Sequence, residues 1–107
     1  MLEIGVEEVK RKLDAGEPIH LLDVREPEEI AICALPGAEH IPMMQLFLGI
    51  QRTTAAQDAE VVLICHHGIR SLEAAQFLRR QGFEKALSMA GGVAEWSRRI
   101  DPDLPRY

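Results

Sequence analysis

A cysteine followed by a short polar loop is the part of this sequence best suited to chemistry. The loop and its cysteine run, in order, Cys65, His66, His67, Gly68, Ile69, Arg70 and Ser71. Residues 61–64 before it are apolar, and residues 71–80 after it have helical periodicity, so Cys65 is expected where a strand gives way to a helix. Unpaired amides at a helix amino end favour an anion such as a thiolate. The pattern predicts a nucleophilic cysteine.

Each polar residue of the loop has an expected role. Gly68 permits a turn that directs successive amides inward as an anion-binding nest. Arg70 supplies permanent positive charge, and His66 and His67 are expected to add partial positive charge or hydrogen bonds. Ser71 is placed to cap the following helix through its hydroxyl. Together these residues form a predicted cradle for the sulfur and for any negatively charged group attached to it.

Two other interpretations of the same residues are weaker. A lone cysteine at the end of a buried strand is often only a small apolar core residue, but here the loop chemistry argues for an active thiol. Zinc ligands are usually separated by two to four residues, whereas Cys65, His66 and His67 are adjacent, so no metal is expected. Ile69, the apolar member of the loop, is expected to serve in packing.

Strands and helices alternate along the chain and would position this loop. Helices are expected over residues 6–15, 27–32, 43–50 and 71–80 and again after Gly91 and Gly92, and strands over residues 19–24, 38–41, 61–64 and 85–89. Such alternation predicts an α/β fold with a parallel sheet covered by helices on both faces. Ligands of parallel sheets bind at the carboxyl ends of the strands, where Cys65 is expected.

Asp23 and Arg25 end their predicted strand at the same edge of the sheet as Cys65. Both side chains are therefore expected to border the crevice. A salt bridge that holds the loop is favoured over direct participation in catalysis, so we treat them as possible support for the site.

Four segments together resemble one known family. Cys65 and the six residues after it resemble the C-x-x-G-x-R-S active-site loop of rhodanese-domain sulfurtransferases. The other matching segments are residues 21–26 (LLDVRE), 35–38 with 40–42 (LPGA and HIP), and 90–96 (AGGVAEW). They occur in the family's order and spacing and cover nearly the whole chain. The resemblance implies a rhodanese-like fold with a central five-stranded parallel sheet, formed by residues 1–107 as a single domain.

The resemblance also implies sulfur transfer. Related phosphatases and arsenate reductases have five residues between cysteine and arginine, whereas four separate Cys65 from Arg70, which suits a sulfur atom better than a phosphate. The family reaction would take sulfur from thiosulfate or a similar small anionic donor, through a Cys65 persulfide, to cyanide, a thiol or a thioredoxin-like acceptor, without a cofactor. A persulfide carrier that docks to partner proteins is the alternative, and a phosphatase or arsenate reductase ranks third.

The second cysteine lies where the sequence departs from the family. Cys33 and Ala34 stand where the family usually has glycine and histidine, which alters the wall beside the loop. Cys33 is either a resolving thiol for Cys65 or, as we favour, a buried structural residue. Trp96 is expected in the core.

The composition excludes several classes of protein. With 107 residues, 47% of them hydrophobic, an ordinary globular domain is expected. The net charge of −5 and the scattered basic residues argue against nucleic-acid binding. No apolar run approaches the length of a membrane span, no secretory signal is recognised, and two cysteines are too few for a disulfide framework. A cytoplasmic protein is therefore expected.

Overall fold

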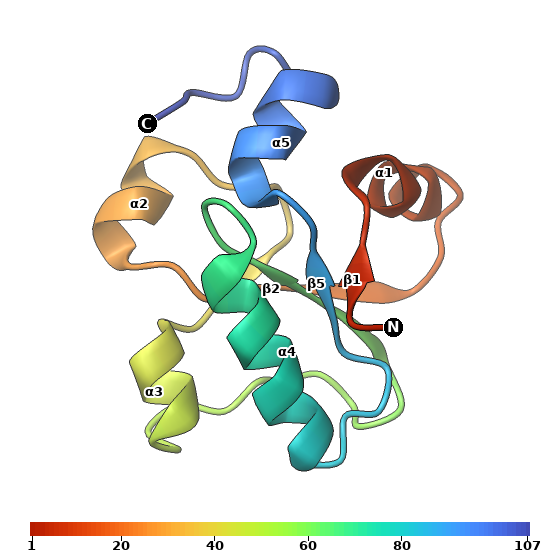
Figure 1. Cartoon of the computed structure of the whole chain (residues 1–107), viewed down its shortest axis with the longest axis vertical. Helices are drawn as coiled ribbons and strands as arrows, with labels where there is room; N and C mark the ends of the chain where they lie inside the picture. The colour runs from red at the N-terminus through yellow and green to blue at the C-terminus, as the bar shows by residue number, and fades with distance from the viewer.

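Five parallel strands form the framework of the protein in a computed structural model that describes residues 1–107 (Figure 1). Their order across the sheet is β1-β5-β4-β2-β3, and every neighbouring pair is parallel. The strands are β1 (Glu3–Ile4), β2 (Ile19–Asp23), β3 (Glu39–His40), β4 (Glu60–Ile64) and β5 (Leu87–Met89). The predicted α/β fold with a five-stranded parallel sheet is confirmed.

Helices cover both faces of this sheet, as expected. They are α1 (Val6–Asp14), α2 (Pro27–Ile32), α3 (Met43–Phe47), α4 (Ile69–Arg80) and α5 (Gly92–Arg99). Residues of α1 and α5 belong to one buried cluster, and residues of α3 and α4 belong to the other. Figure 1 shows the same division, with α1 and α5 in the upper part of the view and α3 and α4 below.

Strand β4 carries the centre of the core and leads directly into the cysteine loop. It pairs with β2 on one side and with β5 on the other. Val62 and Ile64 contribute to the cluster beneath α1 and α5, whereas Val61 and Leu63 contribute to the cluster beneath α3 and α4. All four side chains are buried, which explains why the strand is apolar throughout instead of alternating. Cys65 continues the second of these two rows.

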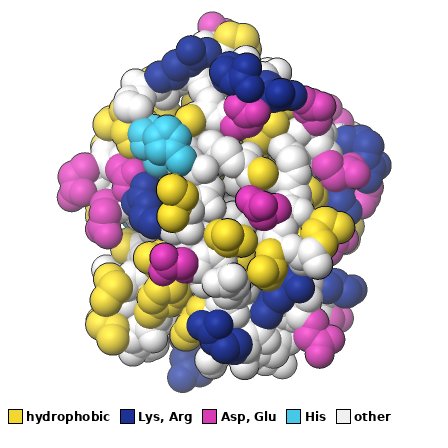
Figure 2. Space-filling model, in the orientation of Figure 1, with side chains coloured by type: hydrophobic (Ala, Val, Ile, Leu, Met, Phe, Trp, Pro, Cys, Tyr) yellow, Lys and Arg dark blue, Asp and Glu magenta, His cyan; other side chains and the backbone are white.

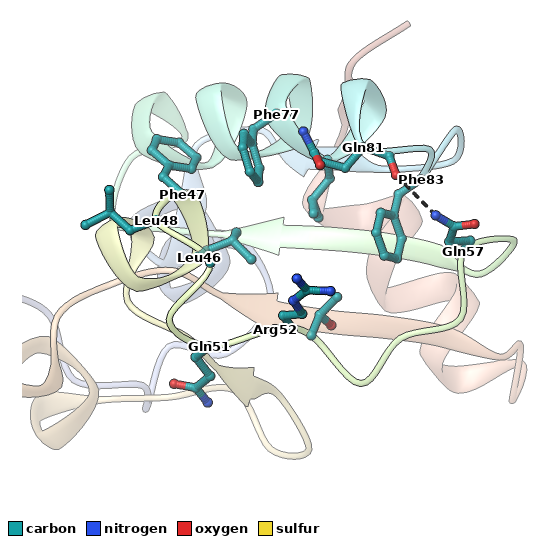
Figure 3. Close-up of a pocket in the computed structure, with 12 residues that line it drawn as sticks. Leu46, Phe47, Leu48, Gln51, Arg52, Gln57, Phe77, Gln81 and Phe83 are labelled. Carbon is teal, nitrogen blue, oxygen red and sulfur yellow. Dashed lines mark hydrogen bonds between the residues drawn. The ribbon is translucent and has the colours of Figure 1, made fainter.

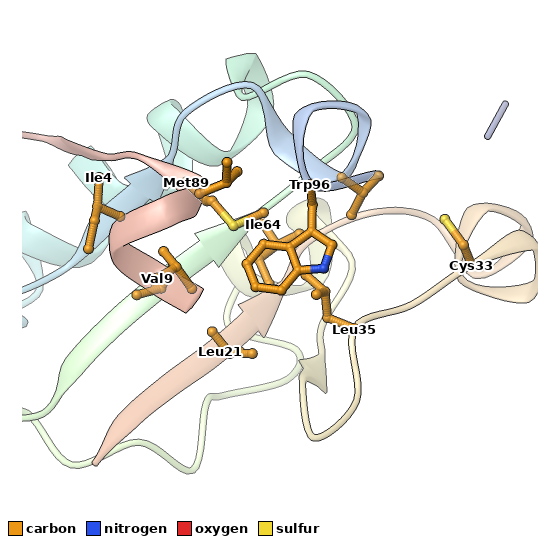
Figure 4. Close-up of a cluster of buried hydrophobic side chains, with 11 residues drawn as sticks. Ile4, Val9, Leu21, Cys33, Leu35, Ile64, Met89 and Trp96 are labelled. Atoms are coloured by element: carbon orange, nitrogen blue, oxygen red, sulfur yellow. The ribbon is translucent and has the colours of Figure 1, made fainter. Parts of the chain in front are cut away.

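Trp96 fills the cluster beneath α1 and α5, as predicted. Figure 4 shows its indole ring packed among side chains from the sheet and from α1, including Leu21 and Val9. Cys33 lies at the border of this cluster and is 6% exposed, which agrees with its interpretation as a buried structural residue. Cys65 belongs to the cluster on the opposite face.

The most informative differences from the predicted elements concern β1, α3 and α4. Strand β1 was not expected, because its two residues are too few to show a periodic pattern, yet it pairs with β5 through Glu3 and Ser88. Helix α3 ends at Phe47 and not at residue 50, and Leu48 and Ile50 beyond it are 67% and 71% exposed. Helix α4 begins at Ile69, two residues before the predicted start.

A large cavity lies away from the cysteine loop. Its volume is about 550 Å³, and side chains of α3 and α4 line it together with residues of the connecting segments (Figure 3). Among the labelled residues, Phe47, Phe77 and Phe83 supply aromatic walls and Arg52 supplies a cation. None of the residues 65–71 lines this cavity, so the cavity and the predicted site are two separate places in the molecule. No helix is long and apolar enough to span a bilayer.

Candidate active site

Two backbone amides of the cysteine loop point at the sulfur. The amide of Gly68 donates to Cys65 Sγ over 3.1 Å, and the amide of Ser71 donates to the same sulfur over 3.3 Å. Gly68 is the N-cap residue of α4 and has a φ of 96°, a left-handed conformation that favours glycine. The predicted amide cradle is therefore present, and it is built by a left-handed turn immediately before the helix.

Ser71 contributes differently from our expectation. Because α4 begins at Ile69, Ser71 lies inside the first turn of the helix and does not cap it; that part of the prediction was wrong. Its hydroxyl oxygen lies 3.3 Å from Cys65 Sγ and 2.7 Å from the hydroxyl oxygen of Ser88 in β5. The serine thus contributes a third polar group to the sulfur, and it connects the loop to a strand that the sequence analysis had not linked to the site.

The amino end of α5 holds the cysteine loop from behind. The amide of Val93 donates to the carbonyl oxygen of Cys65 over 2.9 Å, and the amide of Ala94 donates to the carbonyl oxygen of His66 over 3.1 Å. Gly92 permits this approach, because a Cβ atom at its position would lie 2.3 Å from the Cys65 carbonyl oxygen. The resemblance of residues 90–96 to a family signature now has a physical reason, since these residues anchor the loop.

Aromatic rings stack on the outer side of the loop. The His66 ring lies 3.9 Å from the His67 ring and 3.8 Å from the Tyr107 ring, measured between centroids. Burial, together with repulsion from His67, lowers the pKa of His66. His66 is therefore less charged near neutral pH than an exposed histidine would be, and its partial positive charge is smaller than we expected.

Arg70 forms an ion pair with α2. Its two terminal nitrogens donate to the two carboxylate oxygens of Glu29, both over 2.7 Å, and the Tyr107 hydroxyl donates to Glu29 over 2.8 Å. The hydrogen bonds from Arg70 lower the pKa of Glu29 to about 2. Burial raises the pKa of Tyr107 to about 12. The positive charge predicted at the loop is present and is balanced by a carboxylate that the sequence analysis did not identify.

Ile69 was expected to pack, but it is 73% exposed. It occupies the first position of α4, where its side chain lies on the outer surface of the loop. His67 is also exposed. Figure 2 shows a histidine surface where Figure 1 draws the loop before α4, with basic and acidic side chains interspersed over the same face. The backbone amides of the loop therefore point at the sulfur, whereas the side chains of His67 and Ile69 point at solvent.

Asp23 and Arg25 form the expected salt bridge. Both are buried, and Arg25 donates to Asp23 through Nε over 3.0 Å and through Nη2 over 2.8 Å. Although burial opposes its charge, hydrogen bonds with Asp23 raise the pKa of Arg25. Arg25 also donates to the carbonyl oxygen of Cys33 over 2.8 Å and to the Tyr107 hydroxyl over 2.8 Å. No hydrogen bond joins either residue to the loop, so their contact with it is indirect.

Comparison with known proteins agrees with this arrangement. Residues 5–99 match the family described as "Rhodanese-like domain". In Bacillus subtilis (strain 168), "Putative sulfurtransferase YtwF" is 37% identical over 100 residues, which cover 94% of this chain and 94% of that protein. "Putative sulfur carrier protein YrkF" of the same organism is 34% identical over 99 residues, which cover 92% of this chain and 52% of that protein. The chain belongs to the rhodanese-like domain family.

A solved structure gives the same result. The human single-domain sulfurtransferase TSTD1 superposes with a TM-score of 0.83 at 29% identity, covering 92% of this chain and 97% of that one. Several curated relatives are longer, and the chain spans only 26% of the length of "Probable adenylyltransferase/sulfurtransferase MoeZ" of Mycobacterium tuberculosis, to which it is 35% identical over 100 residues. The family model, the solved structure and relatives of matching length, among them proteins named as sulfurtransferases, agree with the fold described above.

The contact between α5 and the loop yields a prediction about Gly92. Replacing Gly92, which has a φ of 61°, with alanine should lower the free energy of unfolding by more than about 2 kcal/mol, because backbone strain adds to a clash with the loop. Gly37→Ala is the matched control, since Gly37 has a φ of 79° but open space around its Cβ position; it should cost about 1–2 kcal/mol. Urea unfolding of both variants measures the difference. Equal losses would contradict a tight contact at Gly92.

The Arg70 ion pair yields a prediction about acid stability. The pKa of Glu29 falls from 4.5 in its ordinary state to about 2 in the folded protein. Between these values the unfolded chain binds more protons, so the stabilisation is complete above about pH 4.5 and is lost as the pH falls toward 2. Glu29→Gln should flatten this part of the stability curve, measured by urea unfolding at several pH values. Glu28→Gln, at an exposed position in the same helix, should leave the curve unchanged.

Proposed function

We propose that the protein transfers sulfane sulfur through a persulfide on Cys65. In the first half-reaction the Cys65 thiolate attacks the outer sulfur of thiosulfate, the sulfur–sulfur bond of the donor breaks, and sulfite leaves with the bonding electron pair. In the second, cyanide or a thiol attacks the outer sulfur of the persulfide, and the Cys65 thiolate leaves. This is covalent catalysis in two steps, and ping-pong kinetics follow from it.

The observation that carries this proposal is the set of polar groups around Cys65 Sγ. Two amides that donate to it and one hydroxyl lie within 3.3 Å of it, at the junction of a buried strand and a helix amino end. The two amides stabilise a thiolate and assist its departure when the acceptor takes the outer sulfur. Four residues separate Cys65 from Arg70, which supports a sulfur atom as the bound group in preference to a phosphate.

The remaining residues of the predicted site receive supporting roles in this proposal. Gly68 and Ser71 hold the sulfur, and Arg70 supplies charge for an anionic donor. The side chains of His66, His67 and Ile69 form the outer rim at which donor and acceptor arrive. Asp23 and Arg25 hold the segment around Cys33 in place and form no direct contact with the sulfur of Cys65 in this proposal. All of these groups come from one sheet and its helices, which supports residues 1–107 as one functional domain.

A persulfide carrier that is loaded by a partner protein is the second candidate. A relative named as a putative sulfur carrier protein favours it. The two functions share the persulfide and differ in the donor. Sulfur uptake from free thiosulfate with rapid transfer to cyanide supports the enzyme, whereas loading only by a partner desulfurase supports the carrier.

The persulfide is tested directly by intact mass spectrometry. After incubation with thiosulfate in the absence of reductant, the protein should gain one sulfur atom, about 32 Da, on its covalent nucleophile. Cys65→Ser should gain nothing and should keep its fold by circular dichroism. Cys33→Ala is the matched control and should still gain the sulfur, because Cys33 lies on the other face of the sheet. A gain of sulfur by Cys65→Ser would refute the proposal.

The charge of Arg70 is tested by steady-state kinetics. Arg70→Ala should lower kcat/KM for thiosulfate by about 10- to 100-fold, because a charge-assisted hydrogen bond contributes roughly 1.5–3 kcal/mol. Arg80→Ala, at an exposed position in the last turn of the same helix, is the control and should retain the wild-type value. Wild-type thiosulfate kinetics in Arg70→Ala would exclude a role for this arginine in donor binding.

A further inference from the structure

Three polar side chains form a continuous line from the sulfur into the sheet. The hydroxyl oxygen of Ser71 lies 3.3 Å from Cys65 Sγ, and the hydroxyl oxygen of Ser88 lies 2.7 Å from that of Ser71. Ser88 also reaches back to the loop, because its hydroxyl donates to the carbonyl oxygen of Gly68 over 3.4 Å. The line thus begins and ends on the cysteine loop.

Ser88 lies in the middle of the sheet, at a position where an apolar residue is the usual choice. It belongs to β5, faces Leu63 of β4 and Glu3 of β1 in the strand register, and is completely buried. Burial of a hydroxyl is costly unless it forms hydrogen bonds. The only partners of the Ser88 hydroxyl are Ser71 and the Gly68 carbonyl, so its hydrogen bonds serve the cysteine loop.

When Cys65 is a neutral thiol, every proton in this line has an acceptor. The thiol donates to the Ser71 hydroxyl oxygen, the Ser71 hydroxyl donates to Ser88, and the Ser88 hydroxyl donates to the carbonyl oxygen of Gly68. In this arrangement no hydroxyl proton points at the sulfur. The line is therefore directed away from Cys65.

When the thiol proton leaves to a base in solvent, both hydroxyls can rotate without gaining or losing a proton. Ser88 then donates to Ser71, and Ser71 donates to the thiolate, while the Gly68 carbonyl gives up its bond from Ser88. A hydrogen bond to an ion is about twice as strong as one between neutral groups, and donation into the Ser71 oxygen strengthens the bond that Ser71 forms. The reversed line therefore favours the thiolate over the thiol.

We propose that Ser88 is a positioning residue that stabilises the Cys65 thiolate through the hydroxyl of Ser71. Ser88 touches neither the sulfur nor any substrate, and it acts by donating a hydrogen bond to the Ser71 oxygen, which strengthens the hydrogen bond that Ser71 donates to the thiolate. The inference rests on the proposed function in one respect, namely that the thiolate of Cys65 is the working form. It adds to the site a residue 23 positions away in the sequence, outside the cysteine loop.

The test is a pH titration of the Cys65 thiolate, followed by its ultraviolet absorbance with the Cys65→Ser variant subtracted. Ser88→Ala should move the midpoint upward by about 0.5–1 pH unit, the equivalent of one hydrogen bond. A midpoint that is unchanged or lower would overturn the inference. Ser97→Ala is the matched control, because Ser97 is equally buried but its hydroxyl bonds to Leu104 and Arg106, away from the loop.

A double variant tests whether Ser88 acts through Ser71. Ser71→Ala alone should raise the midpoint further than Ser88→Ala, because it removes the hydroxyl next to the sulfur. In the Ser71→Ala background, adding Ser88→Ala should shift the midpoint no further, since interacting residues are not additive. An equal, additive shift would mean that Ser88 affects the sulfur by another route and would refute the line of hydrogen bonds.

A purely structural role for Ser88 gives a different result. Ser88→Ala would then lower the thermal unfolding midpoint while leaving the titration of Cys65 unchanged, which overturns the inference. The titration uses no sulfur donor, so it is independent of the mass-spectrometric test of persulfide formation. A wild-type protein that takes no sulfur but shows the Ser88 shift would refute the proposed function and leave this inference intact.

Discussion

The contact between the cysteine loop and the amino end of α5 is the constraint on which the site depends. The amides of Val93 and Ala94 donate hydrogen bonds to the carbonyl oxygens of Cys65 and His66. Gly92 has no side chain, so the backbone of α5 can lie close to the backbone of the loop. Because α5 holds these carbonyl groups, the loop turns at Gly68, and the amides of Gly68 and Ser71 point at the sulfur of Cys65. The last helix thus orients a loop that precedes it in the sequence by more than twenty residues.

Charges near the loop are paired with one another and not with the sulfur. Arg70 forms an ion pair with Glu29, and Arg25 forms one with Asp23. The Tyr107 hydroxyl accepts a hydrogen bond from Arg25 and donates one to Glu29. The groups that point at Cys65 Sγ are instead backbone amides and a hydroxyl. The two amide dipoles are fixed by the backbone and need no rearrangement when charge moves on or off the sulfur, which suits the proposed alternation of Cys65 between thiolate and persulfide.

The sequence alone predicted those parts of the site that are contiguous with Cys65. The apolar strand β4, the turn at Gly68 and the amide cradle follow from local residue types, and the motif order identified the fold. The role of Ser71 was misjudged because serine is common at the N-cap position, whereas Gly68 holds that position here and α4 begins at Ile69. Ser88 and Glu29 escaped notice because only the folded sheet and α2 bring them to the loop. Nothing in a single sequence shows which distant segments meet.

The placement of the two cysteines determines how sulfur can leave the protein. Cys33 and Cys65 belong to separate buried clusters on opposite faces of the sheet, and both are free thiols with no hydrogen bond between them. In the proposed cycle, the persulfide on Cys65 therefore passes its sulfur to a visiting molecule and not to Cys33. The supply of such external acceptors would then set how fast the loaded protein is discharged.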